Sequence, residues 1–73
     1  MFTVYFKYTD GNEALCDSIN KIDIETSSGY ATISNEQILA YHFRPHGTMY
    51  LYSDTSNYSV STHGLLYMEI REK

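Results

Sequence analysis

Short segments of alternating apolar and polar residues, separated by turn-forming residues, constrain the fold of this chain most. Near the N-terminus, single residues such as Tyr5 separate Phe2, Val4 and Phe6. A period of two places such apolar side chains on one face of a β-strand and the intervening side chains on the other. The abundant Tyr, Thr, Ile and Val residues also favour the half-buried surface of a sheet. The pattern therefore predicts a mainly β protein.

Turn-forming residues interrupt these segments at intervals of roughly eight to twelve residues. Asp10 and Gly11 are typical of a tight hairpin, because glycine adopts a positive φ at little cost. Gly29 indicates another turn, and residues 44–47 a third in which proline presets φ. We predict a single all-β domain over residues 1–73, of about seven to eight short antiparallel strands with short 3-10-like corners. Its architecture is either a small barrel or a compact sandwich.

An internal similarity supports this arrangement. Residues 33–44 align without a gap on residues 60–71, with serine, leucine and arginine identical at three positions. A fainter copy in residues 14–24 shares only the apolar spacing and has its corner at residues 17–18. Each copy is typical of a strand end, a polar corner and a second strand. If the two clear copies are equivalent, they predict matching core sites for Leu39 with Leu66 and for Phe43 with Ile70.

The segment after Ser34 allows two interpretations. Ser34 and Gln37 fit a capping box, which starts a helix, and such a helix would continue to residue 43 before Pro45 ends it. Alternatively, one helical turn precedes a strand over residues 39–44. We favour the second interpretation, since the aligned copy contains Gly64, a poor helix former.

Charge and size exclude several classes of protein. The chain has nine acidic and five basic side chains, a formal net charge of −4. This balance argues against a protein that binds the phosphate backbone, which needs clustered Lys and Arg. No segment approaches the ~20 apolar residues of a spanning helix, and no signal-peptide pattern is present. Cys16 is the single cysteine, so we expect a cytoplasmic protein without an internal disulfide or a membrane segment.

Metal binding and catalysis have little support in the sequence. The three histidines, His42, His46 and His63, lack the paired spacing with Cys16 that zinc sites show. We expect Cys16 to be buried and inert, because no neighbouring motif would lower the pKa of its thiol. A domain of this size also has little room for the pockets of ~300 Å³ and above that substrates need. We therefore expect no metal, no cofactor and no enzymatic activity.

Tyrosines that alternate with core residues are the most suggestive functional feature. If Val4, Leu51 and Met68 face the core, the neighbouring tyrosines face away from it. Tyrosine is favoured at interfaces because it combines a large apolar area with a hydrogen-bonding tip. The alternative is that these rings cover a second packed face or pair across strands of one sheet. The predicted protein-binding residues are Tyr5, Tyr50, Tyr52 and Tyr67.

These observations favour a small non-catalytic protein-binding module whose partner is another protein or a second copy of itself, as a homodimer. The alternatives are a single-stranded nucleic-acid binder that stacks bases on the same rings, and an acidic phage-type inhibitor of a nucleic-acid-binding protein. Binding by the two alternatives should weaken steeply with salt. The compact single domain favours a prokaryotic or mobile-element origin.

Overall fold

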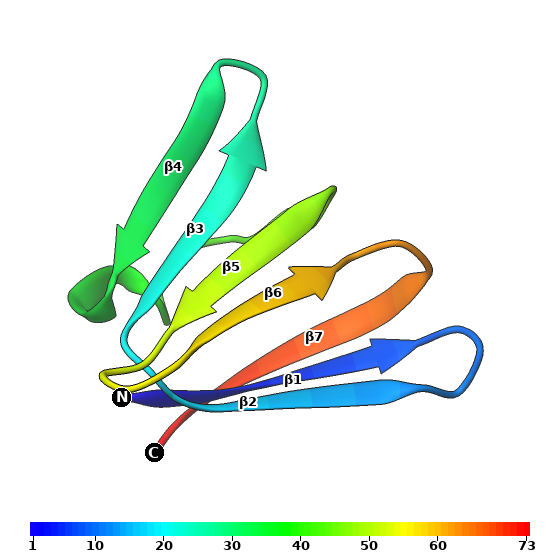
Figure 1. Ribbon diagram of the computed structural model, residues 1–73, viewed down its shortest axis with the longest axis horizontal. Helices are drawn as coiled ribbons and strands as arrows, with labels where there is room; N and C mark the ends of the chain where they lie inside the picture. Colours follow the sequence, from blue (N-terminus) through cyan, green and yellow to red (C-terminus); the bar gives the residue numbers. More distant parts are fainter.

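Seven β-strands form two antiparallel sheets in the computed structural model, which describes residues 1–73 (Figure 1). One sheet has the strand order β2-β1-β7 and the other β4-β3-β5-β6. The strands are β1 (Phe2–Tyr8), β2 (Glu13–Ile19), β3 (Lys21–Thr26), β4 (Gly29–Ser34), β5 (Thr48–Tyr52), β6 (Asn57–Ser61) and β7 (Leu65–Glu72). The all-β prediction is confirmed. The sheets do not close into a barrel, because β6 and β7 follow one another without pairing.

Both sheets contribute side chains to one hydrophobic core. The alternation in β1 works as the sequence predicts, since Val4 and Phe6 are fully buried while Tyr5 faces outward. Met49 and Leu51 on β5 are buried from the second sheet in the same way. The remaining core members are Phe2, Cys16, Ile19, Ile22, Ile33 and Ile38.

The predicted corner at residues 17–18 is a β-bulge inside β2, and the chain passes from one sheet to the other just after it, at Asn20. Phe2 pairs with Ile19 and Val4 pairs with Cys16, so β2 contains one extra residue in this interval. Ser18 adopts a φ of 59° there. A bulge of this kind increases the local twist and bends the strand. It leads β2 directly into β3, and the Asn20 N–H bonds the Tyr52 carbonyl at 2.9 Å.

The predicted equivalence of residues 33–44 and 60–71 is wrong for the second strand of the copy. Residues 65–71 belong to β7, which pairs with β1, whereas residues 39–44 form an irregular connection. Leu39 and Leu66 are therefore not core residues, with exposed fractions of 56% and 62%. Leu66 lies at a register shift in β7, while Ile38 takes the core position next to Leu39. Phe43 and Ile70 do pack against the core, as predicted, the first from a loop and the second from a strand.

A single helical turn, η1 (Asn35–Gln37), follows Ser34, so the longer helix does not form. The Gln37 side-chain oxygen accepts hydrogen bonds from the Ser34 backbone N–H at 3.3 Å and from the Ser34 hydroxyl at 3.0 Å. The helical turn is therefore stabilised locally, while Ile38 anchors the chain in the core. The protein has no helix with the length and apolar character that crossing a membrane requires.

Candidate protein-binding faces

The first candidate site lies on the outer face of the sheet β2-β1-β7. Tyr5 is the outward residue at the centre of β1, and the residue opposite it on β2 is Leu15. Tyr67 on β7 completes the row, with its ring centroid 6.0 Å from that of Tyr5 and the ring planes tilted by 48°. Leu15 is 63% exposed and Tyr67 is 51% exposed. We call Tyr5, Leu15 and Tyr67 the β1 face.

Ion pairs lie on either side of this apolar row. The Lys7 Nζ atom is 3.2 Å from a Glu13 carboxylate oxygen, and the Arg71 Nε atom is 3.2 Å from a Glu69 carboxylate oxygen. A shallow hollow of about 320 Å³ runs across the face and is lined by Thr3, Tyr5, Leu15, Tyr67, Glu69 and Arg71. The arrangement is an apolar centre with a charged rim, which is the usual anatomy of a protein interface.

The Tyr5 hydroxyl stays protonated over a wide pH range. Partial loss of solvent around the side chain, together with the nearby Glu13 carboxylate, raises the pKa of Tyr5 to about 12. The pKa of Glu13 is correspondingly lowered, first by a hydrogen bond from Tyr5 and then by Lys7. At neutral pH, Tyr5 therefore presents an uncharged ring and a hydrogen-bonding hydroxyl to a partner.

Three tyrosines form a second cluster on the outer face of the other sheet. The Tyr30 and Tyr50 ring centroids are 5.9 Å apart in an edge-to-face arrangement. The Tyr52 hydroxyl donates a 3.2 Å hydrogen bond to Asp23, and the Lys21 ammonium lies 4.4 Å from the Tyr52 ring centroid. We call Tyr30, Tyr50 and Tyr52 the β5 face. The Tyr52 hydroxyl and ring already contact Asp23 and Lys21 of the same chain, so the β5 face offers fewer free groups to a partner than the β1 face does.

The four predicted tyrosines therefore do not form one patch. All four face away from the core, but Tyr5 and Tyr67 lie on one sheet, and Tyr50 and Tyr52 lie on the other. Neither Tyr5 nor Tyr67 packs beside Tyr50, because Tyr30 fills that position. Alternation fixes the side of a strand on which a ring lies but not the strand that becomes its neighbour.

Sequence reasoning missed Tyr30 and Leu15 as members of these faces. Both positions carried a usable signal. Leu15 directly precedes the buried Cys16, and Tyr30 lies three residues before the buried Ile33. An odd separation along a strand places two side chains on opposite faces. Both residues are therefore expected on the outer side once their neighbours are known to be buried.

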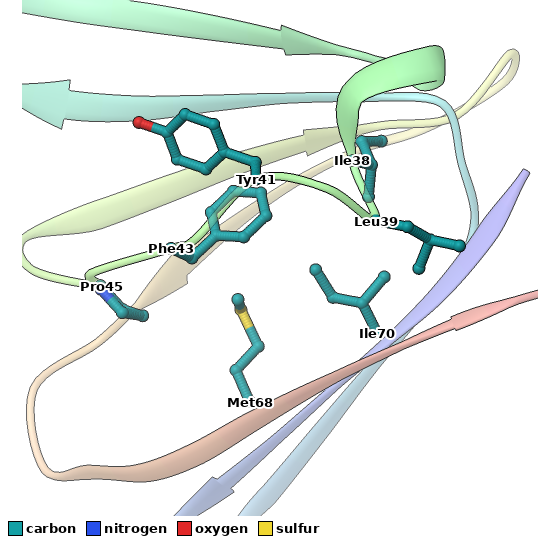
Figure 2. A pocket seen from close by; sticks show the side chains of 7 residues that line it. All are labelled: Ile38, Leu39, Tyr41, Phe43, Pro45, Met68 and Ile70. Carbon is teal, nitrogen blue, oxygen red and sulfur yellow. The ribbon is translucent and has the colours of Figure 1, made fainter.

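An apolar groove on the inner side of β7 was also missed. The connection after η1 crosses over this strand, and the space between them measures about 330 Å³ (Figure 2). Figure 2 shows Met68 and Ile70 pointing from β7 toward Phe43 in the connection. The groove is lined by Ile38, Leu39, Tyr41, Phe43, Pro45, Met68 and Ile70. No potential general acid, base or nucleophile lies among its aliphatic and proline residues, and Tyr41 is its one ionisable side chain.

The other chemically capable side chains lie apart from both faces. His42 and His46 are in the exposed connection before β5, and His63 is in the turn before β7. No group of three or more His, Cys, Asp or Glu side chains is arranged to hold a metal ion. Cys16 is buried, and burial raises the pKa of its thiol, which disfavours the reactive thiolate.

The two carboxylates of β3, Asp23 and Glu25, have structural partners. Asp23 accepts a 2.7 Å hydrogen bond from the Thr32 hydroxyl in addition to the bond from Tyr52. Glu25 accepts a hydrogen bond from the Thr48 backbone N–H and so fixes the start of β5. Both carboxylates therefore stabilise the sheet β4-β3-β5-β6.

No protein-family model, curated protein or solved structure matches this chain.

Proposed function

We propose that this chain is a small non-catalytic protein-binding module that docks its partner on the β1 face. The row of Leu15, Tyr5 and Tyr67, in which Leu15 and Tyr67 are exposed, is the observation that carries the proposal. An exposed leucine beside aromatic rings gains free energy when a partner removes it from water, about 25 cal/mol per Å² of apolar area. Tyrosine rings on a hydrogen-bonded sheet also lose little conformational entropy on binding, because they have few rotatable bonds.

The charges around the β1 face suit a protein partner better than a nucleic acid. Of the five basic side chains, Lys7, Arg71 and Lys73 each form an ion pair with a carboxylate of this chain. Neutralised lysines and arginines contribute little to phosphate binding. The single-stranded nucleic-acid alternative therefore has less support.

The net charge of −4 steers basic partners toward the protein. The acidic-inhibitor reading is thus a special case of the same proposal, in which the partner is itself a nucleic-acid-binding protein. The free, buried thiol of Cys16 is compatible with the reducing cytoplasm, where we propose that the module acts.

A matched pair of variants tests the β1 face. Leu15→Ser with Tyr67→Ser removes two exposed members of this face, and Tyr30→Ser with Tyr50→Ser does the same on the β5 face. Each purified variant is used to capture partners from lysate of the source organism, beside the wild-type chain, and self-association is measured by sedimentation velocity.

The proposal expects the β1-face variant to lose a protein, or a self-association, that the wild-type chain and the β5-face variant both retain. Circular dichroism and a cooperative urea transition establish that both variants are folded. Retention of every partner and of any self-association by the folded β1-face variant would overturn the proposal.

A further inference from the structure

β7 is an edge strand with an unused row of backbone hydrogen-bonding groups. It pairs only with β1, through a register that places Thr3 opposite Arg71 and Tyr5 opposite Glu69. In the same register, the Lys73 N–H bonds the Met1 carbonyl at 2.9 Å. Bonded and non-bonded pairs alternate in an antiparallel ladder. The odd-numbered residues from 67 to 73 therefore bond β1, and Met68, Ile70 and Glu72 direct their N–H and C=O groups to the open side.

The same stretch carries Met68 and Ile70 on its inner face, followed by Glu72 at its end, and mixed charges on its outer face. Met68 and Ile70 line the groove under the connection, while Glu69 and Arg71 point outward and form an ion pair. An edge of this kind is a template for a further strand unless proline or like charges block it. β7 contains no proline, and its two central outward charges have opposite signs.

We propose, as an extension of the proposed protein-binding function, that the partner of this edge is β7 of a second copy of the chain. The two strands run antiparallel about a two-fold axis at Ile70. The pairing rule then places Glu69 opposite Arg71 of the second copy, and Arg71 opposite its Glu69. Tyr67 lies opposite Lys73 of the second copy, whose ammonium is paired with Asp17 of its own chain.

Charge complementarity selects this register over its neighbours. An axis at Glu69 would place Glu69 opposite itself, and an axis at Arg71 would place Arg71 opposite itself, so that like charges repel. An axis at Met68 places Glu69 opposite Tyr67 without any ion pair. An axis between two of these residues would pair a residue whose backbone N–H and C=O groups point to the open edge with one whose groups point to β1. An antiparallel ladder does not allow such a pair. Only the axis at Ile70 gives two ion pairs.

The pairing would join the two three-stranded sheets into one continuous sheet. It would form about six new backbone hydrogen bonds between Met68, Ile70 and Glu72 of the two copies. A two-fold axis perpendicular to the sheet places both inner faces on one side, where Ile70 meets Ile70 of the second copy and each Met68 lies opposite Glu72 of the other copy. Both β1 faces lie together on the other side, and the dimer presents two docking sites to a partner.

Two charge reversals test the proposal when they are mixed. Glu69→Arg alone and Arg71→Glu alone each oppose like charges in a homodimer, so both variants should dimerise at least about tenfold more weakly than wild type. In a mixed dimer every opposed pair is complementary. Mixing the two variants should therefore restore association. Sedimentation velocity over roughly 5–500 µM chain measures both effects.

The matched control uses the other ion pair of the same sheet. Glu13→Lys and Lys7→Glu change the net charge by the same amounts and break the 3.2 Å pair between these residues, away from the open edge. Their mixture should behave as the wild-type chain does. If mixing the two control variants strengthened association as much as mixing the Glu69→Arg and Arg71→Glu variants, net charge alone would explain the association. That result would overturn the proposed strand pairing.

The doubly reversed variant, Glu69→Arg with Arg71→Glu, tests the register without changing the net charge. It keeps one acidic and one basic side chain at positions 69 and 71. It therefore also tests the pairing if either single variant fails to fold. It should form homodimers as the wild-type chain does, but no mixed dimers with wild type, because like charges would then be opposed.

Different results would contradict the proposed edge pairing and the proposed docking on the β1 face. A wild-type chain that is monomeric throughout this range overturns the edge pairing, while capture of a partner by its β1 face would still support the proposed function. A dimer that ignores the charge reversals but is lost with Leu15→Ser and Tyr67→Ser places self-association on the β1 face and also overturns the edge pairing.

Discussion

The Tyr8 hydroxyl donates a 2.6 Å hydrogen bond to the Ser61 backbone carbonyl and so joins β1 to β6, which belong to different sheets. A second bond, from the Thr9 N–H to the Gly64 carbonyl at 2.8 Å, lies in the neighbouring turns. These contacts hold the sheets together at the end where β6 turns into β7. Burial raises the pKa of Tyr8, so its hydroxyl remains a donor well into alkaline solution.

Replacing Tyr8 with Phe should lower the free energy of unfolding by about 0.5–1.5 kcal/mol, the typical net contribution of one hydrogen bond, since the Ser61 carbonyl loses its protein partner. Urea denaturation measures the change. Tyr67→Phe is the control, because Tyr67 is largely exposed and should lose well under 1 kcal/mol, roughly the range of surface substitutions. Equal effects of the two substitutions would show that the bond between the sheets contributes nothing.

Ile38 and Leu39 are adjacent but should respond very differently to truncation. Ile38→Ala should cost about 2–5 kcal/mol, because Ile38 is a buried member of the core. Leu39→Ala should cost about 0.5 kcal/mol, as expected for an exposed residue. Leu66→Ala should resemble Leu39→Ala. Chemical denaturation of the three variants measures these changes. A large loss of unfolding free energy in Leu39→Ala would show that Leu39 belongs to the core.

Gly47 should tolerate no side chain. Its φ is +66°, and an added Cβ would collide with the Glu25 carboxylate that accepts the Thr48 N–H. Gly47→Ala should therefore cost about 1–3 kcal/mol through backbone strain, and more through loss of the Glu25 contact. Gly64→Ala is the matched control, because φ there is +74° and the nearest atom allows ordinary contact. Thermal or urea unfolding that shows equal losses would contradict a role for Glu25.

The raised pKa of Tyr5 predicts a loss of stability at high pH. The folded protein keeps the Tyr5 proton up to about pH 12, whereas the unfolded chain releases it near the ordinary pKa of 10.0. Between these values the folded state binds more protons, so the free energy of unfolding must fall as pH rises. Tyrosinate absorbance, compared with a Tyr5→Phe variant, measures the step. A Tyr5 titration near its ordinary pKa would contradict the combined influence of partial desolvation and the Glu13 carboxylate.

The sequence by itself determined which side of each strand a residue occupies. Phe2, Val4 and Phe6 repeat at a period of two, so Tyr5 had to face outward in any sheet that buries them. Glycine at hairpin positions likewise marked turns between strands, whereas the predicted corner at residues 17–18 lies inside β2, just before the chain turns into β3. These properties depend on local chain geometry, which neighbouring residues specify.

Only the tertiary structure decided which strands lie side by side. Residues 39–44 and 66–71 carry similar apolar patterns, yet only the second segment is a strand, because it pairs along the free side of β1. Tyr5 therefore meets Tyr67, while Tyr50 on the other sheet meets Tyr30. Register shifts and the separation of the sheets arise from contacts between segments distant in sequence, and a local period of two contains no information about them.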